Sequence, residues 1–244
     1  MKKYVTTGLA LAFWLLVWQL LSLQVGLPLL LPAPGKVALR LFELVQTDTF
    51  WSSTFLSLLR VVSGIFWGAA LGLLLGIACR NGILDALIRP LMTVVKSTPV
   101  ASVTILVLLW LDRDTVPVLI AGMMVLPAVW AGICAGISQT DPQLLEMSAA
   151  YGFSPAKKLL HIYIPSVLPY FRAACGSALG LAWKAGIAAE VLAVPARSMG
   201  KMIFESKLYF MTEDLFAWTL AVILLSLLVE KLLMTLLSGG KRHA

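Results

Sequence analysis

Residues 54–79 read TFLSLLRVVSGIFWGAALGLLLGIAC, an apolar run of 26 residues with a single charged side chain, Arg60. About 20 consecutive apolar residues suffice to cross the hydrocarbon core of a bilayer as an α-helix. The whole chain has this character, because 60% of its 244 residues are hydrophobic, 13% are charged, and the mean hydropathy is +0.92. A typical soluble domain is about half apolar and a quarter charged. The composition excludes a soluble fold and disorder, and it predicts an all-α membrane protein.

The run at 54–79 is one of six stretches that we expect to span the membrane. The predicted spans are residues 8–25, 54–79, 91–111, 116–137, 168–193 and 215–237. Lys96 and Pro99 interrupt the third, which predicts a kinked or partly unwound helix that faces protein. The connecting segments are too short for a second folded domain, so we expect a single membrane domain over residues 1–244.

Basic residues predict the orientation, because Lys and Arg are retained on the cytoplasmic side during membrane insertion. With the N-terminus inside, ten Lys and Arg residues lie in the inner loops and span ends, and six lie on the outer side. Four acidic residues then lie inside and eight outside. Both termini are therefore predicted to be cytoplasmic.

Glycine recurs every fourth residue in the second span, at Gly64, Gly68, Gly72 and Gly76. Residues at this spacing share one face of a helix, and glycine lets another helix approach closely. Close helix packing is the role that we expect for this face.

Arg172, Glu230 and Lys231 are counted with the cytoplasmic loops and span ends, and four further charged residues fall within the predicted spans. They are Arg60, Lys96, Lys184 and Glu190. A charge in hydrocarbon is costly, so each should face protein or a water-filled path. We consider them candidates for the translocation path of a solute, and the three cations favour an anion. A structural role for Arg60 and Lys184, and snorkelling of Lys96 to the interface, remain alternatives. Glu190 lies six residues after Lys184, too far around the helix for an i,i+4 pair, so a counter-charge is expected from a neighbouring helix.

The three cysteines, Cys79, Cys134 and Cys175, lie in apolar runs, and none has a partner at metal-ligand spacing. We interpret them as small core residues and predict no metal site. The eight tryptophans are expected to be core or interfacial residues.

The longest polar interruption runs from 138 to 169, on the predicted cytoplasmic side. Asp141 and Ser154 are good N-caps, each is followed by proline at the first helical position, and Gly152 lies between them. The segment predicts two short helices joined at a glycine, with the second ending near Pro165. Such a helix-turn-helix is a preformed surface for a partner protein, and an interfacial helix lying on lipid is the alternative.

The segment also carries a gapped motif: EMSAAYG at 146–152, nine residues, then IYIP at 162–165. Its spacing resembles the E-A-A-x-x-x-G-(nine)-I-x-L-P motif of membrane permeases of bacterial ABC importers. Met147, Ser148 and Ile164 depart from that pattern. The resemblance implies that the segment binds a cytoplasmic ATPase, with the family's motif positions falling on Glu146, Gly152, Ile162 and Pro165.

The rest of the chain looks closest to the nitrate, sulfonate and taurine branch of these permeases. The similar stretches are LPAPG at 31–35, SLLRVVSG at 57–64 and AWKAGIAAE at 182–190. The chain departs from the branch at 111–113, Leu-Asp-Arg, and at 198–200, Ser-Met-Gly.

The resemblance further implies a multi-pass permease subunit in the bacterial cytoplasmic membrane. Its expected partners are a cytoplasmic ABC ATPase dimer, a second permease copy (with a homodimer preferred) and an external solute-binding protein; nucleic acid is not expected. ATP and Mg²⁺ are expected on the ATPase, with no cofactor on this chain.

Other classes find less support in the residues. No G-x-x-x-x-G-K-[ST] phosphate loop occurs, so the chain is not expected to be an enzyme or to hydrolyse ATP itself. An intramembrane hydrolase lacks a base, because the two histidines, His161 and His243, lie outside the spans. An ATP-independent secondary transporter is the alternative function, although neither inverted repeats nor midplane acids are evident.

Overall fold

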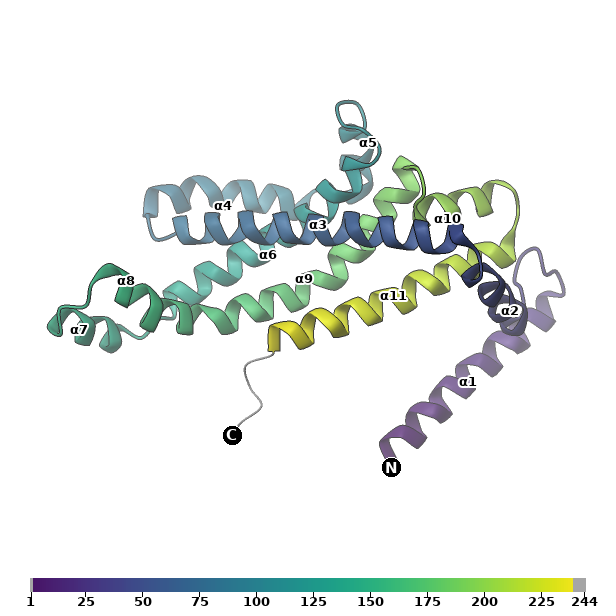
Figure 1. The fold of residues 1–244 in the computed structure, drawn as a ribbon, viewed down its shortest axis with the longest axis horizontal. Coiled ribbons are helices and arrows are strands. Elements are labelled where there is room, and N and C mark those ends of the chain that lie inside the picture. The colour runs from purple at the N-terminus through teal and green to yellow at the C-terminus, as the bar shows by residue number, and fades with distance from the viewer. Residues whose placement is uncertain (1, 239–244) are drawn as a thin grey trace.

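The computed structural model of the chain describes residues 2–238, and side chains for 6–235. Over residues 2–238 the secondary structure is entirely helical, as the composition predicts. The helices are α1 (Lys2–Val25), α2 (Pro34–Val45), α3 (Asp48–Ala78), α4 (Gly82–Ser97), α5 (Val100–Val107), α6 (Thr115–Ser138), α7 (Pro142–Ala150), α8 (Pro155–Lys158), the π-helix η1 (Leu159–Tyr163), α9 (Ile164–Ala193), α10 (Met199–Leu208) and α11 (Thr212–Ser238) (Figure 1).

Four of these helices, α1, α3, α6 and α11, are long and apolar enough to cross a membrane. The pair α4 and α5 brings the number of candidate spans to five if it is taken as one broken span. The two helices meet at an angle of 99°. The break falls at Thr98 and Pro99, because proline has no N–H to continue the helix and disfavours helical backbone in the residue before it. The interruption expected in the third predicted span is therefore present, and it is a sharp bend.

The centre of the molecule is formed by α3, α6 and α9. A Cβ atom on Gly64 would lie 2.8 Å from Ala121 Cβ, and one on Gly68 would lie 2.9 Å from Gly122 Cα. At these positions the backbones of α3 and α6 lie so close together that there is no room for a Cβ atom on α3. Gly72 and Gly76 continue the same face against α6. Val61, Val125, Val129, Ile133, Ala178 and Ala182 form the buried core among the three helices.

Helices α2 and α10 and the beginning of α11 pack together at the end of the bundle opposite α7 and α8 (Figure 1). Phe50 and Trp218 stack there with ring centroids 5.2 Å apart, over the buried side chain of Met199. Arg40 on α2 forms an ion pair with Asp214 on α11. These contacts give one end of the bundle a second core of its own.

Helix α1 runs away from the bundle in Figure 1, and among the side chains described from residue 6 onward its contacts with the rest of the chain lie in its C-terminal half. These contacts include hydrogen bonds from Trp18 Nε1 to the Pro32 carbonyl oxygen at 3.1 Å and from Ser22 Oγ to that of Leu31 at 2.9 Å, and packing of the Trp18 ring on Phe216. Phe13 and Trp14, further along α1, are 59% and 67% exposed. Most of this helix therefore remains exposed in one chain.

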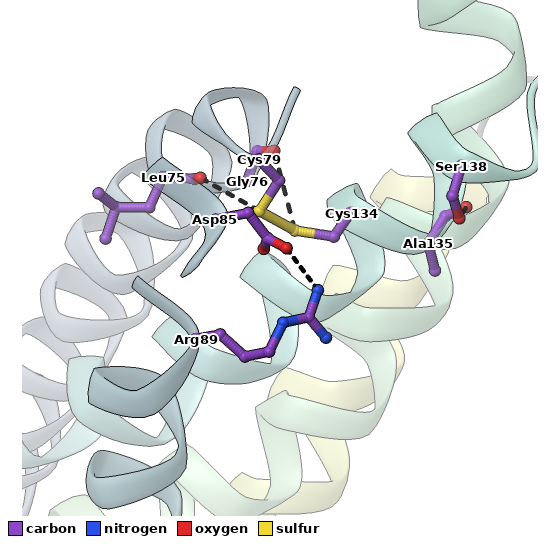
Figure 2. Close-up of a disulfide and its surroundings, with 8 residues drawn as sticks. All are labelled: Leu75, Gly76, Cys79, Asp85, Arg89, Cys134, Ala135 and Ser138. Atoms are coloured by element: carbon purple, nitrogen blue, oxygen red, sulfur yellow. Dashed lines mark hydrogen bonds and ion pairs between the residues drawn. A yellow bond between two sulfur atoms is a disulfide. The ribbon is translucent and has the colours of Figure 1, made fainter. Parts of the chain in front are cut away.

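The structure corrects the prediction for two of the cysteines. Cys79, which follows α3, and Cys134 on α6 form a disulfide with their Cα atoms 6.0 Å apart (Figure 2). The glycine face brings the two helices close enough for this bond. The 55 residues between the two positions conceal the pairing in the sequence. Cys175 is a buried free thiol, as predicted.

Candidate coupling segment and buried ionic network

Helix α7 begins at a side-chain cap directly after the long helix α6. The Asp141 carboxylate accepts the backbone N–H of Gln143 at 2.8 Å, and Pro142 occupies the first turn. An aspartate in this position satisfies one of the free N–H groups that begin every helix. Only the short stretch 139–141 separates the end of α6 from α7. Very little chain therefore joins α7 to α6.

Gly152 forms the turn that ends α7. Its φ is +61°, in the left-handed region that residues with a side chain rarely adopt. The Gly152 N–H donates to the Ala149 carbonyl oxygen at 3.1 Å, and the Phe153 N–H donates to that of Ser148 at 2.9 Å. A Cβ atom at Gly152 would meet nothing within 4 Å, so the backbone angle, and not space, favours glycine here.

The second short helix starts as the sequence predicts but does not end where it predicts. Ser154 caps α8 by accepting the Lys157 N–H, with Pro155 in the first turn. An end near Pro165 is wrong, because α8 continues through the π-helix η1 into α9. The wider π turn lies directly before Pro165 and relieves the clash and the missing N–H that a proline brings to a regular helix.

The four motif positions occupy different environments in this segment. Glu146 on α7 and Pro165 on α9 are exposed, Gly152 forms the turn, and Ile162 is 4% exposed and anchors η1. The remaining exposed residues of α7 are largely apolar, including Leu144 and Met147, and the exposed Tyr151 follows the helix directly. Apolar side chains around one exposed acid form a surface suited to a protein partner.

At the other end of the molecule Glu190 lies in a buried ionic network. Its carboxylate is fully buried and accepts three bonds: from the Ser57 hydroxyl at 2.6 Å, the Gly200 N–H at 3.1 Å and Arg60 Nη1 at 3.3 Å. The Ser57 Oγ in turn accepts the Met199 N–H at 2.9 Å. The network joins α3, α9 and the start of α10, and it leaves the buried carboxylate well satisfied.

Arg60 extends the network to the loop after α9. Its Nη2 donates to the Ala196 carbonyl oxygen at 3.0 Å, and the same guanidinium pairs with Asp114, directly before α6. Val194 and Arg197 in that loop have φ values of 50° and 48°, which are unfavourable for residues with side chains. The arginine thus fixes a strained loop, and its position fits a structural role better than a free place in a solute path.

The four intramembrane residues singled out in the sequence do not gather at one place. Arg60 and Glu190 pair, and the counter-charge for Glu190 comes from a neighbouring helix, α3. Lys96, in the last turn of α4, and Lys184 on α9 are both exposed on this chain. Sequence reasoning missed Ser57, Asp114 and Gly200 as members of the network. Serine, glycine and a loop aspartate are common residues, and no spacing links them.

The fold and the segment at one end define a class of protein. It is a multi-pass helical membrane protein in which an exposed helix-turn-helix connects the long helices α6 and α9. Residues 64–238 of the chain match a protein family that is described as the binding-protein-dependent transport system inner membrane component. The chain belongs to this family, and it is an inner-membrane permease subunit of the ABC importer class, as the motif predicted.

Several relatives in bacteria are similar over most of the chain. SsuC of Bacillus subtilis (strain 168), provisionally named an aliphatic sulfonates transport permease protein, is 26% identical over 204 residues, 82% of this chain and 74% of that protein. TauC of Escherichia coli (strain K12), the taurine transport system permease protein, is 24% identical over 236 residues, 92% of this chain and 83% of TauC. ProW of the same strain, a glycine betaine/proline betaine transport system permease protein, is 26% identical over 197 residues, 79% of this chain and 52% of ProW. These relatives agree with the importer reading and give no support to an ATP-independent secondary transporter.

Proposed function

We propose that this permease carries a small anionic solute of the sulfonate type across the membrane, driven by a separate ATPase. The observation that carries the proposal is the capped helix-turn-helix at one end of the bundle, with its exposed apolar surface on α7. The relatives named for sulfonate and taurine transport support the solute class. Permeases of this class act with an ATPase and a solute-binding protein, and ATP and Mg²⁺ are held by the ATPase.

The coupling segment, residues 138–169 from the end of α6 to the first turns of α9, transmits movement from the ATPase to the bundle. Its residues 143–161 bind the ATPase, with Glu146 and the apolar residues of α7 in contact and Gly152 setting the angle between α7 and α8. Ile162 and Pro165 connect the segment to α9. When ATP binding closes the ATPase dimer, the segment moves with it, and α6 and α9 follow because they continue directly from its two ends. The bundle then alternates between inward and outward access.

The chain crosses the membrane six times, with both termini in the cytoplasm. The broken pair α4 and α5 and the long helix α9 complete the set begun by α1, α3, α6 and α11. The excess of Lys and Arg on the coupling side supports this orientation. The ionic network around Glu190 then lies toward the outer face, where an external binding protein delivers the solute.

A second copy of the chain completes the translocation path. Helix α1 exposes Leu9, Phe13 and Trp14, and its hydrogen bond from Trp18 to the rest of the chain lies in its C-terminal half. An apolar helix in this position is expected to pack on a neighbouring copy. Lys96 and Lys184, exposed on one chain, are charges that a path between two copies would keep in water or in contact with an anion.

The coupling assignment is tested by Gly152→Asp. The substitution places a side chain on a residue with φ of +61°, which displaces α7 relative to α8 without touching the bundle core. We expect normal membrane insertion and dimer formation but at least a tenfold loss, roughly 1.4 kcal/mol in coupling, of ATP-dependent sulfonate uptake by reconstituted transporter. Uptake at the normal rate would remove the basis of the assignment.

Gly82→Asp is the matched control. Gly82 begins α4 at the same end of the molecule, and a Cβ atom there would also meet nothing within 4 Å. An acid in the first turn of a helix is favourable, so this variant should transport normally. If both variants lose uptake equally, the added charge and not the turn geometry is responsible.

A further inference from the structure

Two sulfur atoms and a carboxylate lie together on the same end of the bundle as the coupling segment. The ligand atoms of Cys79, Asp85 and Cys134 all lie within 4.8 Å of one another. Figure 2 shows the Asp85 carboxylate between the sulfur atoms and Arg89. Arg89 Nη2 donates to Asp85 Oδ2 at 2.6 Å, whereas Asp85 Oδ1 is buried and accepts no hydrogen bond. The group is therefore brought together by three elements, with one carboxylate oxygen left without a donor.

The compartment that Cys79 and Cys134 face determines whether the pair is oxidised or reduced in the cell. In the orientation proposed above, on which this step rests, Cys79 and Cys134 lie at the cytoplasmic ends of α3 and α6. Cytoplasmic glutathione and dithiol proteins keep thiols reduced. A dithiol reductant supplies two electrons and two protons, the S–S bond breaks, and two thiols result. A close cysteine pair in a reducing compartment is more typical of metal binding than of structural cross-linking.

We propose that the reduced pair, together with Asp85, binds a thiophilic divalent cation, of which Zn²⁺ is the representative. Binding forms two metal–sulfur bonds and releases the two thiol protons to solvent. Two thiolates, one carboxylate oxygen and one water make the four-coordinate set that zinc takes in proteins. At a Zn–S distance of about 2.3 Å, tetrahedral geometry separates two sulfur ligands by roughly 3.7 Å. A Cα–Cα distance of 6.0 Å accommodates that spacing with a change of side-chain rotamers.

The surroundings provide the fourth ligand position and the supporting contacts. A cavity of about 400 Å³ borders the group and is lined by both cysteines, Asp85, Arg89, Trp130 and Ser138. Water and ions can therefore reach the site. Arg89 donates to Asp85 and lies over the Trp130 ring, and these two contacts hold the carboxylate beside the sulfur atoms. A bound cation would fasten α3 to α6 only eight residues before α7 begins, so it is placed to restrain the coupling segment.

The disulfide supplies a control within the unmodified protein. The full-length chain is purified without a polyhistidine tag and divided into a reduced sample and a sample oxidised with oxidised glutathione. Thiol alkylation followed by mass spectrometry establishes the redox state of each. Competition with a fluorescent zinc indicator then measures binding of Zn²⁺ alone. We expect the reduced chain to bind one zinc ion, and the oxidised chain to bind none over the same range of zinc concentrations. Equal binding by the two samples, or none by the reduced one, overturns the proposal.

Single substitutions test the ligands. Cys79→Ser and Cys134→Ser should each weaken binding by at least about tenfold, since even supporting residues around a metal contribute that much. Asp85→Asn should weaken it by about tenfold as well, and unchanged affinity would refute the three-ligand site. Cys175→Ser, which removes a buried thiol elsewhere, should leave binding unchanged. A loss there equal to the loss in Cys79→Ser would show that the metal is not at this site.

The measurement does not depend on transport. Zinc binding can fail while Gly152→Asp still abolishes uptake, and the reverse outcome is equally readable. The two proposals are thus tested separately.

Discussion

The two ends of this permease are held together by different physics. Around Glu190 a fully buried carboxylate is satisfied by a hydroxyl, a backbone N–H and a guanidinium, and these groups fix three helices and a strained loop. At the opposite end α7 is held by its Asp141 cap and the Gly152 turn, and it has no extensive contact with another helix.

The two kinds of contact differ in how far they let the helices move. A buried ionic network has one good geometry and resists displacement, because every partner left without its counterpart is costly. A helix held by caps and a short connection keeps its shape but can move as a unit, and its exposed apolar residues remain available to a partner. We infer that the end around Glu190 sets the geometry of the bundle and that the end with α7 is the part that responds to the proposed ATPase.

The sharpest way to break this contrast is to remove Glu190. In Glu190→Ala, Arg60 keeps Asp114 but loses its buried partner, and the Ser57 hydroxyl and Gly200 N–H lose their acceptor. Breaking a buried ion pair in this way costs about 3–5 kcal/mol. Equilibrium unfolding in mixed micelles should show that loss, and Glu190→Gln should retain part of the stability.

Glu205→Ala is the matched control for that variant. Glu205 lies on α10 at the same end, 39% exposed, and pairs with Lys201 at 3.6 Å. Exposed ion pairs contribute about 0–1 kcal/mol, so stability should change little. Equal losses in the two variants would refute the special role of the buried carboxylate.

The next largest effect is expected at the glycine face of α3, which packs against α6. Gly68→Ala places a Cβ atom 2.9 Å from Gly122 Cα, and backbone cannot move aside as a flexible side chain can. Overpacking of this kind costs about 1–3 kcal/mol. Gly180→Ala on α9 meets nothing within 4 Å and should leave the free energy of unfolding unchanged or slightly higher. Thermal unfolding of the two variants, measured side by side, decides the point.

A smaller and strictly local effect should follow from loss of the α7 cap. Asp141→Ala removes the acceptor for the Gln143 N–H and should destabilise α7 by about 1 kcal/mol. Hydrogen exchange should accelerate for amides in the first turn of α7 and stay unchanged in α10. Gln143→Ala, which leaves the cap intact, is the control. Faster exchange across the whole bundle would contradict the independence of the two ends.

The smallest effect concerns the pH response of the loop between α5 and α6. The Thr115 hydroxyl donates to the Asp112 carboxylate and lowers the pKa of Asp112 below its usual value. A carboxyl whose pKa is lower when folded adds stability above its unfolded pKa, and that stability is lost as the pH falls through the folded pKa. Thr115→Val should raise the Asp112 pKa, as measured by NMR titration of the carboxyl carbon. An unchanged pKa would show that another group is responsible.

Much of the coupling segment was predictable because its causes are local. Asp141 and Ser154 each precede a proline, and Gly152 stands where the turn needs a positive φ. Capping and backbone preference act over three or four residues, so the sequence displays them directly. The end of the second helix was predicted wrongly at Pro165, because the π turn η1 precedes the proline and the helix continues through it into α9.

The ionic network and the cysteine pair show what local reasoning cannot reach. Arg60 and Glu190 were visible as costly charges, yet their pairing and the part played by Ser57 require α3 and α9 to be side by side. Cys79 and Cys134 are brought together by the close approach of α3 and α6.

The sequence by itself determined that this protein is helical, crosses a membrane and carries the motif of an importer permease, because hydropathy, glycine spacing and capping are properties of short stretches. The tertiary structure decided which charges meet, which cysteines face each other and which helix, α1, stays largely exposed. Those outcomes depend on contacts between residues far apart in the chain, and many different sets of contacts are compatible with the same local patterns.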